Sequence, residues 1–174
     1  SEMCIRDRAK ADYPGVVAAH QGWLTEDHRY FFMGDELDEE GGTVDNTRTL
    51  VWDIAELDDP ILATEYFADT KAIDHNMYVR GNLLYQSNLL GGLRILDVSE
   101  PENPVEVAFF DTVPNDDNPT AFGGTWSNYP FFSSGVIKSM GNTCSPPCTS
   151  SRRSRIAAPL FTLVTACAAG KRST

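Results

Sequence analysis

One unit of sequence occurs at least twice in the middle of this chain, and this repetition restricts the fold more than any other feature. TLVWDIAELDDPILATEYF at residues 49–67 matches LRILDVSEPENPVEVAFF at residues 93–110 after a shift of 44 residues. The shift places Asp53 on Asp97. A repeat of this length is typical of arrays and propellers, in which each copy is one small structural unit.

The repeat extends upstream with a longer offset. A shift of 55 residues places His20 on His75 and Tyr30 on Tyr85. The difference between the two offsets fits an acidic insertion, GDELDEEGGTVDN, in the first copy. A third copy begins further along, where Trp126 takes the place of His75.

Each copy consists of short runs rich in Val, Ile, Tyr, Phe and Trp, which are separated by turn signals and lack a helical period. The first copy has four such runs, HQGWLTED, RYFFMGDE, TRTLVWDIAE and ILATEYFAD. Four strands per unit are the plan of a β-propeller blade. The sequence therefore predicts an all-β fold, a partial β-propeller with two four-stranded antiparallel blades and the start of a third.

The repeated pattern D-[IV]-x-E-x-x-[DN]-P has a local structural explanation. A strand ends at the aspartate, and the proline fixes φ where no backbone donor is needed before the next strand. We therefore expect Asp53 and Asp97 to cap turns with their carboxylates, with Pro60 and Pro104 completing those turns.

The ends of the chain differ in composition from its middle. The whole chain has 25 acidic and 14 basic residues, for a net charge of −11, yet residues 136–174 include basic side chains and no acidic ones. The opening SEMCIRDR resembles a peptide translated from sequencing-adaptor DNA. We expect a disordered or artefactual leader over 1–12, the propeller fragment over 13–137, and a disordered basic tail foreign to the repeat over 138–174.

Composition and motifs exclude several classes of function. The net negative charge is opposite to that of a nucleic-acid-binding protein. No apolar stretch reaches the length of about 18 residues that a transmembrane helix needs. The sequence also lacks a nucleophile elbow, a phosphate-binding loop, a dinucleotide fingerprint and a zinc-protease helix motif.

The strands TLVWDI and LRILDV resemble the LVIVD repeat of bacterial β-propellers. HQGWLTEDHRYFFMGDELDE, DHNMYVRGNLLYQSN and GLRILDVSEPENPVEVAFFDT, within residues 13–137, resemble the choice-of-anchor B family. The resemblance implies a secreted or cell-surface propeller domain of seven blades, whose remaining blades would be partners of this segment. Members of the family differ in their C-terminal anchors, and no general biochemical activity is assigned to them.

Two groups of residues are candidates for a site. His20 and His75 start the innermost strands, so with Asp74 and Trp126 they would face the central channel. Histidines that converge on an axis can bind a metal or move protons, and the alternative is that each imidazole pins its strand to the neighbouring blade. We expect Asp74 either to orient His75 or to cap the preceding turn.

The acidic insertion provides the second candidate. Its residues Asp35, Glu36, Asp38 and Glu39 offer oxygen ligands for Ca²⁺ or another divalent metal, although the spacing is not that of an EF-hand. The alternative is a solvated hairpin tip. No cofactor is otherwise indicated.

Alternating aromatic residues of the inner strands are expected to form the core between blades rather than a ligand-binding surface. These are Trp23, Tyr78, Tyr129, Phe131 and Phe132.

Two hypotheses for function follow from the sequence. The first is a non-enzymatic module at the cell surface that binds a protein or a glycan. The second is a metal-assisted hydrolase or other enzyme that uses His20 and His75 at the channel.

Overall fold

The computed structural model describes residues 8–114, 117, 119–141, 154–156 and 162–167, and they form β-sheets without any helix. The first sheet contains β1 (Ala19–Leu24), β2 (Tyr30–Asp35), β3 (Arg48–Asp53) and β4 (Ile61–Phe67). The second contains β5 (Asn76–Arg80), β6 (Leu83–Ser87), β7 (Leu93–Asp97) and β8 (Val105–Phe110). The third contains β9 (Thr125–Tyr129) and β10 (Val136–Gly141). The predicted all-β class is confirmed, with two four-stranded antiparallel units and a third that starts with two strands.

Two further strands join these sheets at their edges. β11 (Ser154–Ile156) pairs antiparallel with β8, and β12 (Thr162–Cys167) pairs parallel with β10. Both lie in the tail for which the sequence predicts disorder, and β10 crosses the boundary expected after residue 137. Most of the expected leader and most of that tail lie outside the described residues, so the predicted domain limits stay predictions.

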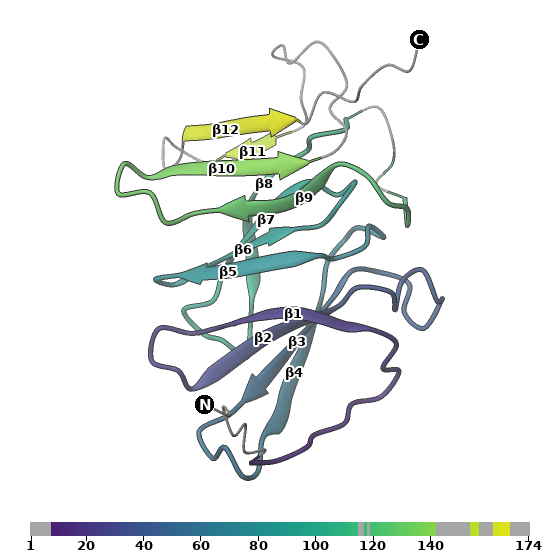
Figure 1. Cartoon of the computed structure of the whole chain (residues 1–174), viewed down its shortest axis with the longest axis vertical. Coiled ribbons are helices and arrows are strands. Elements are labelled where there is room, and N and C mark those ends of the chain that lie inside the picture. The colour runs from purple at the N-terminus through teal and green to yellow at the C-terminus, as the bar shows by residue number, and fades with distance from the viewer. Residues whose placement is uncertain (1–7, 115–116, 118, 142–153, 157–161, 168–174) are drawn as a thin grey trace, which may run out of the picture.

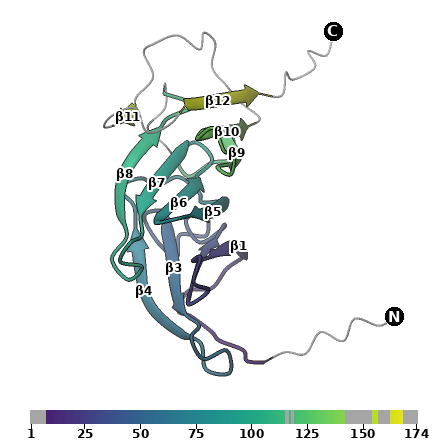
Figure 2. The same cartoon turned by 90° about the vertical axis from the view of Figure 1, so that its left-hand side faces the viewer.

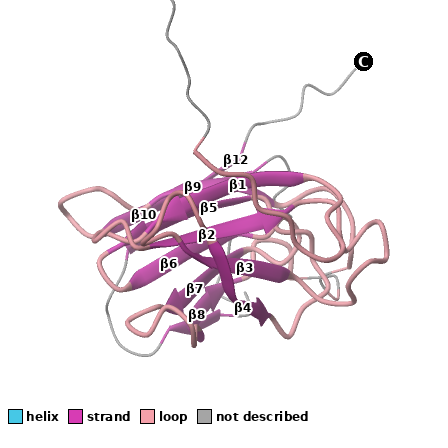
Figure 3. Ribbon diagram, turned by 90° about the horizontal axis from the view of Figure 1, so that it is seen from below, coloured by secondary structure: helices cyan, strands magenta, loops and turns pink. Residues whose placement is uncertain are grey.

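The sheets are stacked along the long axis of the molecule, and the stack curves (Figures 1 and 2). Figure 3 places the first strands β1, β5 and β9 along one side and the last strands β4 and β8 along the other. The side chain of Gln21 on β1 accepts a hydrogen bond from the Met77 N–H and donates to the Met77 carbonyl, so that it holds β1 against β5. A bridge between Leu89 and Thr125 starts the contact with β9. The sheets thus meet along their first strands, an arrangement compatible with propeller blades.

The strand registers identify the equivalent residues of the two complete sheets. Trp23 pairs with Phe32 in the first sheet, and Tyr78 pairs with Tyr85 in the second. Phe32, and not Tyr30, is therefore the counterpart of Tyr85, so the expected superposition of Tyr30 on Tyr85 was wrong. The reason is that the β1–β2 hairpin is two residues longer than the β5–β6 hairpin.

The same irregularity occurs at the same place in both outer strand pairs. Val51 pairs with Thr64 while the next residue pairs with Leu62, so that Ala63 is an extra residue. In the second sheet Ile95 pairs with Ala108 and Leu96 pairs with Glu106, so that Val107 is the extra residue. A β-bulge of this kind bends a strand and increases its twist. The structure thus repeats a local irregularity as well as a strand order.

The core lies between the sheets because successive side chains of a strand point to opposite faces. The layer between the first and second sheets is built from buried side chains of both: Tyr30, Phe32 and Val51 face Met77, Val79, Leu84, Leu96 and Val98. Tyr85, Leu93, Ile95 and Ala108 face Ile137 of the third sheet. Leu50 and Trp52 pack on the other face of the first sheet beneath Tyr13.

The described part of the chain contains no helix that is long and apolar enough to span a membrane. This agrees with the absence of an apolar stretch of that length in the sequence.

Candidate functional site

His20 and His75 converge on the carboxylate of Glu36, at the side of the molecule where β1 and β5 meet. His20 Nδ1 lies 3.2 Å from Glu36 Oε2, and His75 Nε2 lies 3.5 Å from Glu36 Oε1. The centroids of the two imidazole rings are 4.5 Å apart. One nitrogen of each histidine and one oxygen of Glu36 lie within 4.8 Å of one another. Such a group is a candidate site for a divalent metal.

The hydrogen bonds of His75 hold its ring against the third sheet. Its Nδ1 lies 2.7 Å from the carbonyl oxygen of Trp126 and 2.7 Å from Asn76 Nδ2, and that carbonyl also accepts a hydrogen bond from Asn76 Nδ2. The carbonyl would accept a proton from Nδ1 and the amide would donate one to it, so these contacts fix the position of the ring and not its tautomer. Burial lowers the pKa of His75, which favours the neutral ring.

The ring of Trp126 also contacts that of His75, with ring centroids 4.4 Å apart and the planes tilted by 50°. His20, His75 and Trp126 therefore form one row of rings across the three sheets, as equivalent residues of a repeat would. The side chain of His75 is 5% exposed and that of His20 is 34% exposed. The site is thus open to solvent through His20.

Asp74 is not part of this row. It is fully buried, and neither of its carboxylate oxygens has a hydrogen-bond partner within the described part of the chain. It therefore neither orients His75 nor caps the turn before β5. Instead, one oxygen of Asp74 lies within 4.8 Å of oxygens from Asp38 and Glu39.

The acidic insertion separates into residues with different surroundings. Asp35 accepts hydrogen bonds from the Tyr13 hydroxyl and from the N–H groups of Val17 and Ala18, so it anchors the segment before β1. Glu36 joins the histidines. Asp35, Asp38 and Glu39 are buried, so the alternative of a solvated hairpin tip was wrong for these residues.

Arg48 explains part of this burial. It donates from Nε to Asp38 Oδ2 at 2.7 Å and from Nη1 to Glu65 Oε1 at 3.1 Å. One oxygen of Asp38 and one of Glu39 nevertheless have no partner.

The pKa values of the buried carboxyls reflect this shortage of partners. Burial and the neighbouring charges of Asp74 and Asp38 raise the pKa of Glu39 to about 10. Burial, followed by the charges of Asp38, Asp35 and Glu36, raises the pKa of Asp74 well above its usual value. Three carboxyl groups therefore share a buried region with one arginine.

Asp53 and Asp97 lie at the ends of β3 and β7. Each accepts a hydrogen bond from the backbone N–H two residues later, Ala55 at 2.9 Å and Ser99 at 2.8 Å. The strands β4 and β8 start directly after Pro60 and Pro104. These four residues surround turns at the edge of the sheets, away from the histidine row.

The inner strands and the loop after β9 carry a group of aromatic side chains, which we name the aromatic face: Trp23, Tyr78, Tyr129, Phe131 and Phe132. The Trp23 ring centroid lies 5.0 Å from that of Tyr78 and 5.9 Å from that of Phe131. Trp23 is 38% exposed and Tyr129 is 45% exposed. The rings thus contact one another between the sheets, but their exposure shows that the expectation of a buried core was wrong for them.

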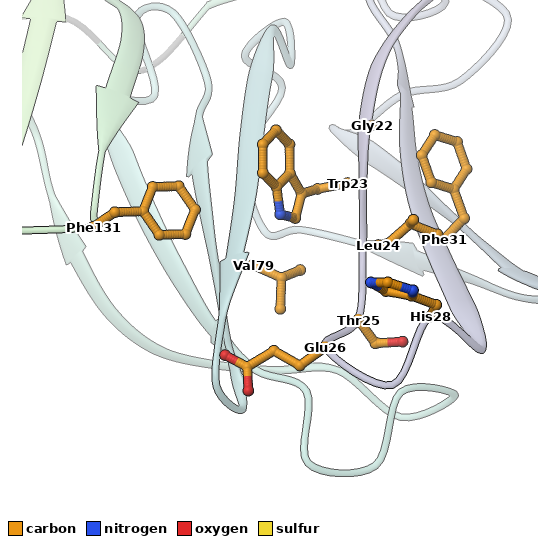
Figure 4. Close-up of a pocket in the computed structure, with 9 residues that line it drawn as sticks. All are labelled: Gly22, Trp23, Leu24, Thr25, Glu26, His28, Phe31, Val79 and Phe131. Atoms are coloured by element: carbon orange, nitrogen blue, oxygen red, sulfur yellow. The ribbon is translucent and has the colours of Figure 1, made fainter.

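A cavity of about 510 Å³ opens beside the aromatic face. Trp23 and Phe131 form one part of its lining and Phe31 another, with Glu26 and His28 at its polar end (Figure 4). Arg80 donates hydrogen bonds to the carbonyls of Pro130 and Phe132 and thereby fixes the loop that carries Phe131. The cavity combines apolar rings with a few polar groups, as ligand sites commonly do.

The sequence suggested the histidines and the acidic residues as two separate candidates. It did not reveal that Glu36 belongs with His20 and His75, nor that Asp74 belongs with Asp38 and Glu39, because each grouping depends on contacts between sheets. The position of Glu36 directly after the β2 strand was the available signal that it belongs with the histidines.

Neither a family model, a curated protein nor a solved structure matches the chain.

Proposed function

We propose that this chain is a segment of an exported β-propeller of the LVIVD or choice-of-anchor B type, and that it acts at the cell surface as a binding module for a glycan. The proposal of a propeller is supported by the repeated strands, their stacking along β1, β5 and β9, and the sequence resemblance. The observation that carries the proposed function is the partly exposed aromatic face beside an open cavity.

Aromatic rings suit this ligand class for a physical reason. The face of a ring carries the negative part of its quadrupole, which attracts the polarised C–H groups on the apolar side of a sugar. Tyr and Trp present a large rigid surface and lose little conformational entropy on binding. The net charge of −11 disfavours an anionic ligand, so we propose that the bound glycan is neutral.

The experiment is a calorimetric titration with neutral hexasaccharides, cellohexaose and chitohexaose. Trp23→Ala and Phe131→Ala are expected to weaken binding at least about tenfold, the loss of roughly 1.4 kcal/mol of stacking. Phe67→Ala is the matched control, because Phe67 is an exposed ring on the outer strand β4. Binding that is equally weakened by all three variants, or absent for every neutral glycan tested, would contradict the proposal and favour a protein ligand.

A metal-assisted hydrolase is a second candidate, favoured by His20, Glu36 and His75. One nitrogen of each imidazole and one oxygen of Glu36 lie within 4.8 Å of one another, a separation that a single bound ion can span. Two imidazoles and one carboxylate are a common ligand set of catalytic zinc, in which a remaining position holds the water that is activated.

Calorimetric titration with Zn²⁺ tests this candidate. One zinc ion per chain is expected, with the binding lost in His75→Ala and in Glu36→Gln. His28→Asn is the control, since His28 lies in the β1–β2 hairpin at φ 60, a conformation that Asn tolerates. Hydrolysis of p-nitrophenyl acetate that requires zinc and both histidines would support the enzyme, whereas zinc binding without hydrolysis would leave a metal-binding module.

A further inference from the structure

Asp74 reaches Asp38 and Glu39 from a different part of the chain. Asp38 and Glu39 belong to the loop between β2 and β3, whereas Asp74 precedes β5 of the next sheet. One oxygen of each carboxyl lies within 4.8 Å of the other two. We call these three side chains the carboxylate trio. All three are buried, and each has at least one oxygen without a hydrogen-bond partner.

Gly34 on β2 makes the approach of Asp74 sterically feasible. A Cβ atom at this position would overlap Oδ2 of Asp74. The backbone of β2 therefore forms one wall of the space that holds the Asp74 carboxyl. The fold brings this side chain into a confined position, and no N–H or O–H group of the described residues donates a hydrogen bond to it.

With all three carboxyls ionised, as metal ligands are, the charges of the region would not balance without a further cation. Arg48 is the cation in direct contact with the cluster, through its hydrogen bond to Asp38 Oδ2. Its other donors bind Glu65 and two carbonyl oxygens. Oδ2 of Asp35 lies 3.9 Å from Arg48 Nη2, and it already accepts hydrogen bonds from the Tyr13 hydroxyl and the Val17 N–H. Buried charges of like sign are costly unless a counter-charge is present.

We propose that the carboxylate trio, Asp38, Glu39 and Asp74, binds one Ca²⁺ ion and thereby joins the first sheet to the second. Each member of the trio offers a carboxylate oxygen, a hard ligand of the type that calcium prefers. Calcium lies about 2.3–2.6 Å from its oxygen ligands, so oxygens up to about 5 Å apart can share it, while the shorter bonds of Mg²⁺, about 2.0–2.1 Å, demand a tighter and more regular shell. This site is distinct from the histidine site, which offers nitrogen ligands.

Thermal unfolding of the full chain at pH 7.4 is measured in EDTA, in 2 mM CaCl₂ and in 2 mM MgCl₂, and the stoichiometry is measured by calorimetric titration with Ca²⁺. We expect one calcium ion per chain and a rise in the midpoint of unfolding with Ca²⁺ that exceeds the rise with Mg²⁺, because the ion binds the folded chain alone. Asp74→Asn is expected to weaken Ca²⁺ binding at least about tenfold, as one charged ligand is lost.

Two further variants keep the test independent of the other proposals. Glu40→Gln removes an exposed carboxylate of the same loop and is expected to leave Ca²⁺ binding unchanged. Glu36→Gln is expected to abolish zinc binding but to retain Ca²⁺ binding. The proposal is overturned if Ca²⁺ neither binds to nor stabilises the folded chain, whatever the effect of Asp74→Asn on the midpoint in EDTA. It is also overturned if Glu40→Gln weakens binding as much as Asp74→Asn does.

Discussion

The hydroxyl of Tyr30 donates a hydrogen bond of 2.6 Å to Oε1 of Glu102, and this bond connects the first sheet to the β7–β8 turn of the second. Its acceptor is a carboxylate, so it belongs to the stronger class of hydrogen bonds. The bond raises the pKa of Tyr30. The ring of Tyr30 packs in the core between the sheets, so one residue joins them through both an apolar face and a polar tip.

Tyr30→Phe is expected to lower the free energy of unfolding by about 1 kcal/mol, because the ring is retained and only the hydrogen bond is lost. Chemical unfolding in urea measures this change. In a double-mutant cycle, Glu102→Ala and Tyr30→Phe should be less than additive, since both remove the same interaction. Strict additivity would mean that the bond contributes nothing in solution.

Gly34→Ala is expected to destabilise the chain by about 1–3 kcal/mol, because the new methyl group overlaps the Asp74 carboxyl and the core must shift. The measurement is urea unfolding in EDTA. In an Asp74→Ala background the same substitution should have little effect, as the overlapping carboxyl is then absent. An equal loss in both backgrounds would place the strain elsewhere on β2.

Arg48→Met is expected to cost about 3–5 kcal/mol, since it leaves the buried carboxylate of Asp38 without its counter-charge. Circular dichroism during urea unfolding measures the loss. Arg29→Met is the matched control, because Arg29 pairs with Asp53 on an exposed surface, where an ion pair contributes little. Similar losses in both variants would contradict the role assigned to Arg48.

Asp53 and Asp97, the aspartates of the two turns, are expected to make the stability of the fold depend on pH in the acid range. The N–H and hydroxyl of Ser99 lower the pKa of Asp97, and hydrogen bonds from Arg29 and then Ala55 lower that of Asp53. A folded-state pKa below the unfolded value gives stability that is present above about pH 4 and is lost as pH falls through the folded value.

The double variant Asp53→Asn, Asp97→Asn tests that prediction. It should keep the turns, because an amide oxygen also accepts the backbone N–H. Its unfolding midpoint should decline less steeply than that of the parent chain between pH 5 and pH 2. Parallel declines for the two proteins would show that other carboxyls control acid unfolding.

Strand order was predictable from the sequence because each strand carries its own signals. Alternating apolar residues, the aspartate at the end of β3 or β7 and the proline before β4 or β8 act within a few residues of one another. The equivalence of Tyr30 and Tyr85 failed for a related reason. A hairpin can gain two residues without changing the pattern of either flanking strand, and only the pairing of Phe32 with Trp23 reveals it.

The composition of the candidate site was less accessible. A run of acidic residues is usually solvated, and nothing local in the sequence indicates that Arg48 folds back onto Asp38. Asp74 sits in sequence beside His75, which suggested one common role. In the structure the two side chains point into different surroundings, since adjacent residues of an extended segment face opposite ways.

The extra residues Ala63 and Val107 restrict how copies of this unit can diverge. Successive side chains of a strand point to its two faces in turn. Loss or gain of one residue beside a bulge would therefore move the buried side chains of the remaining part of that outer strand to the solvent face, and the exposed ones to the core. A change of two residues inverts nothing, and the β1–β2 hairpin differs from its counterpart by this amount. Insertions and deletions that survive within the paired regions of this repeat are therefore expected to come in even steps.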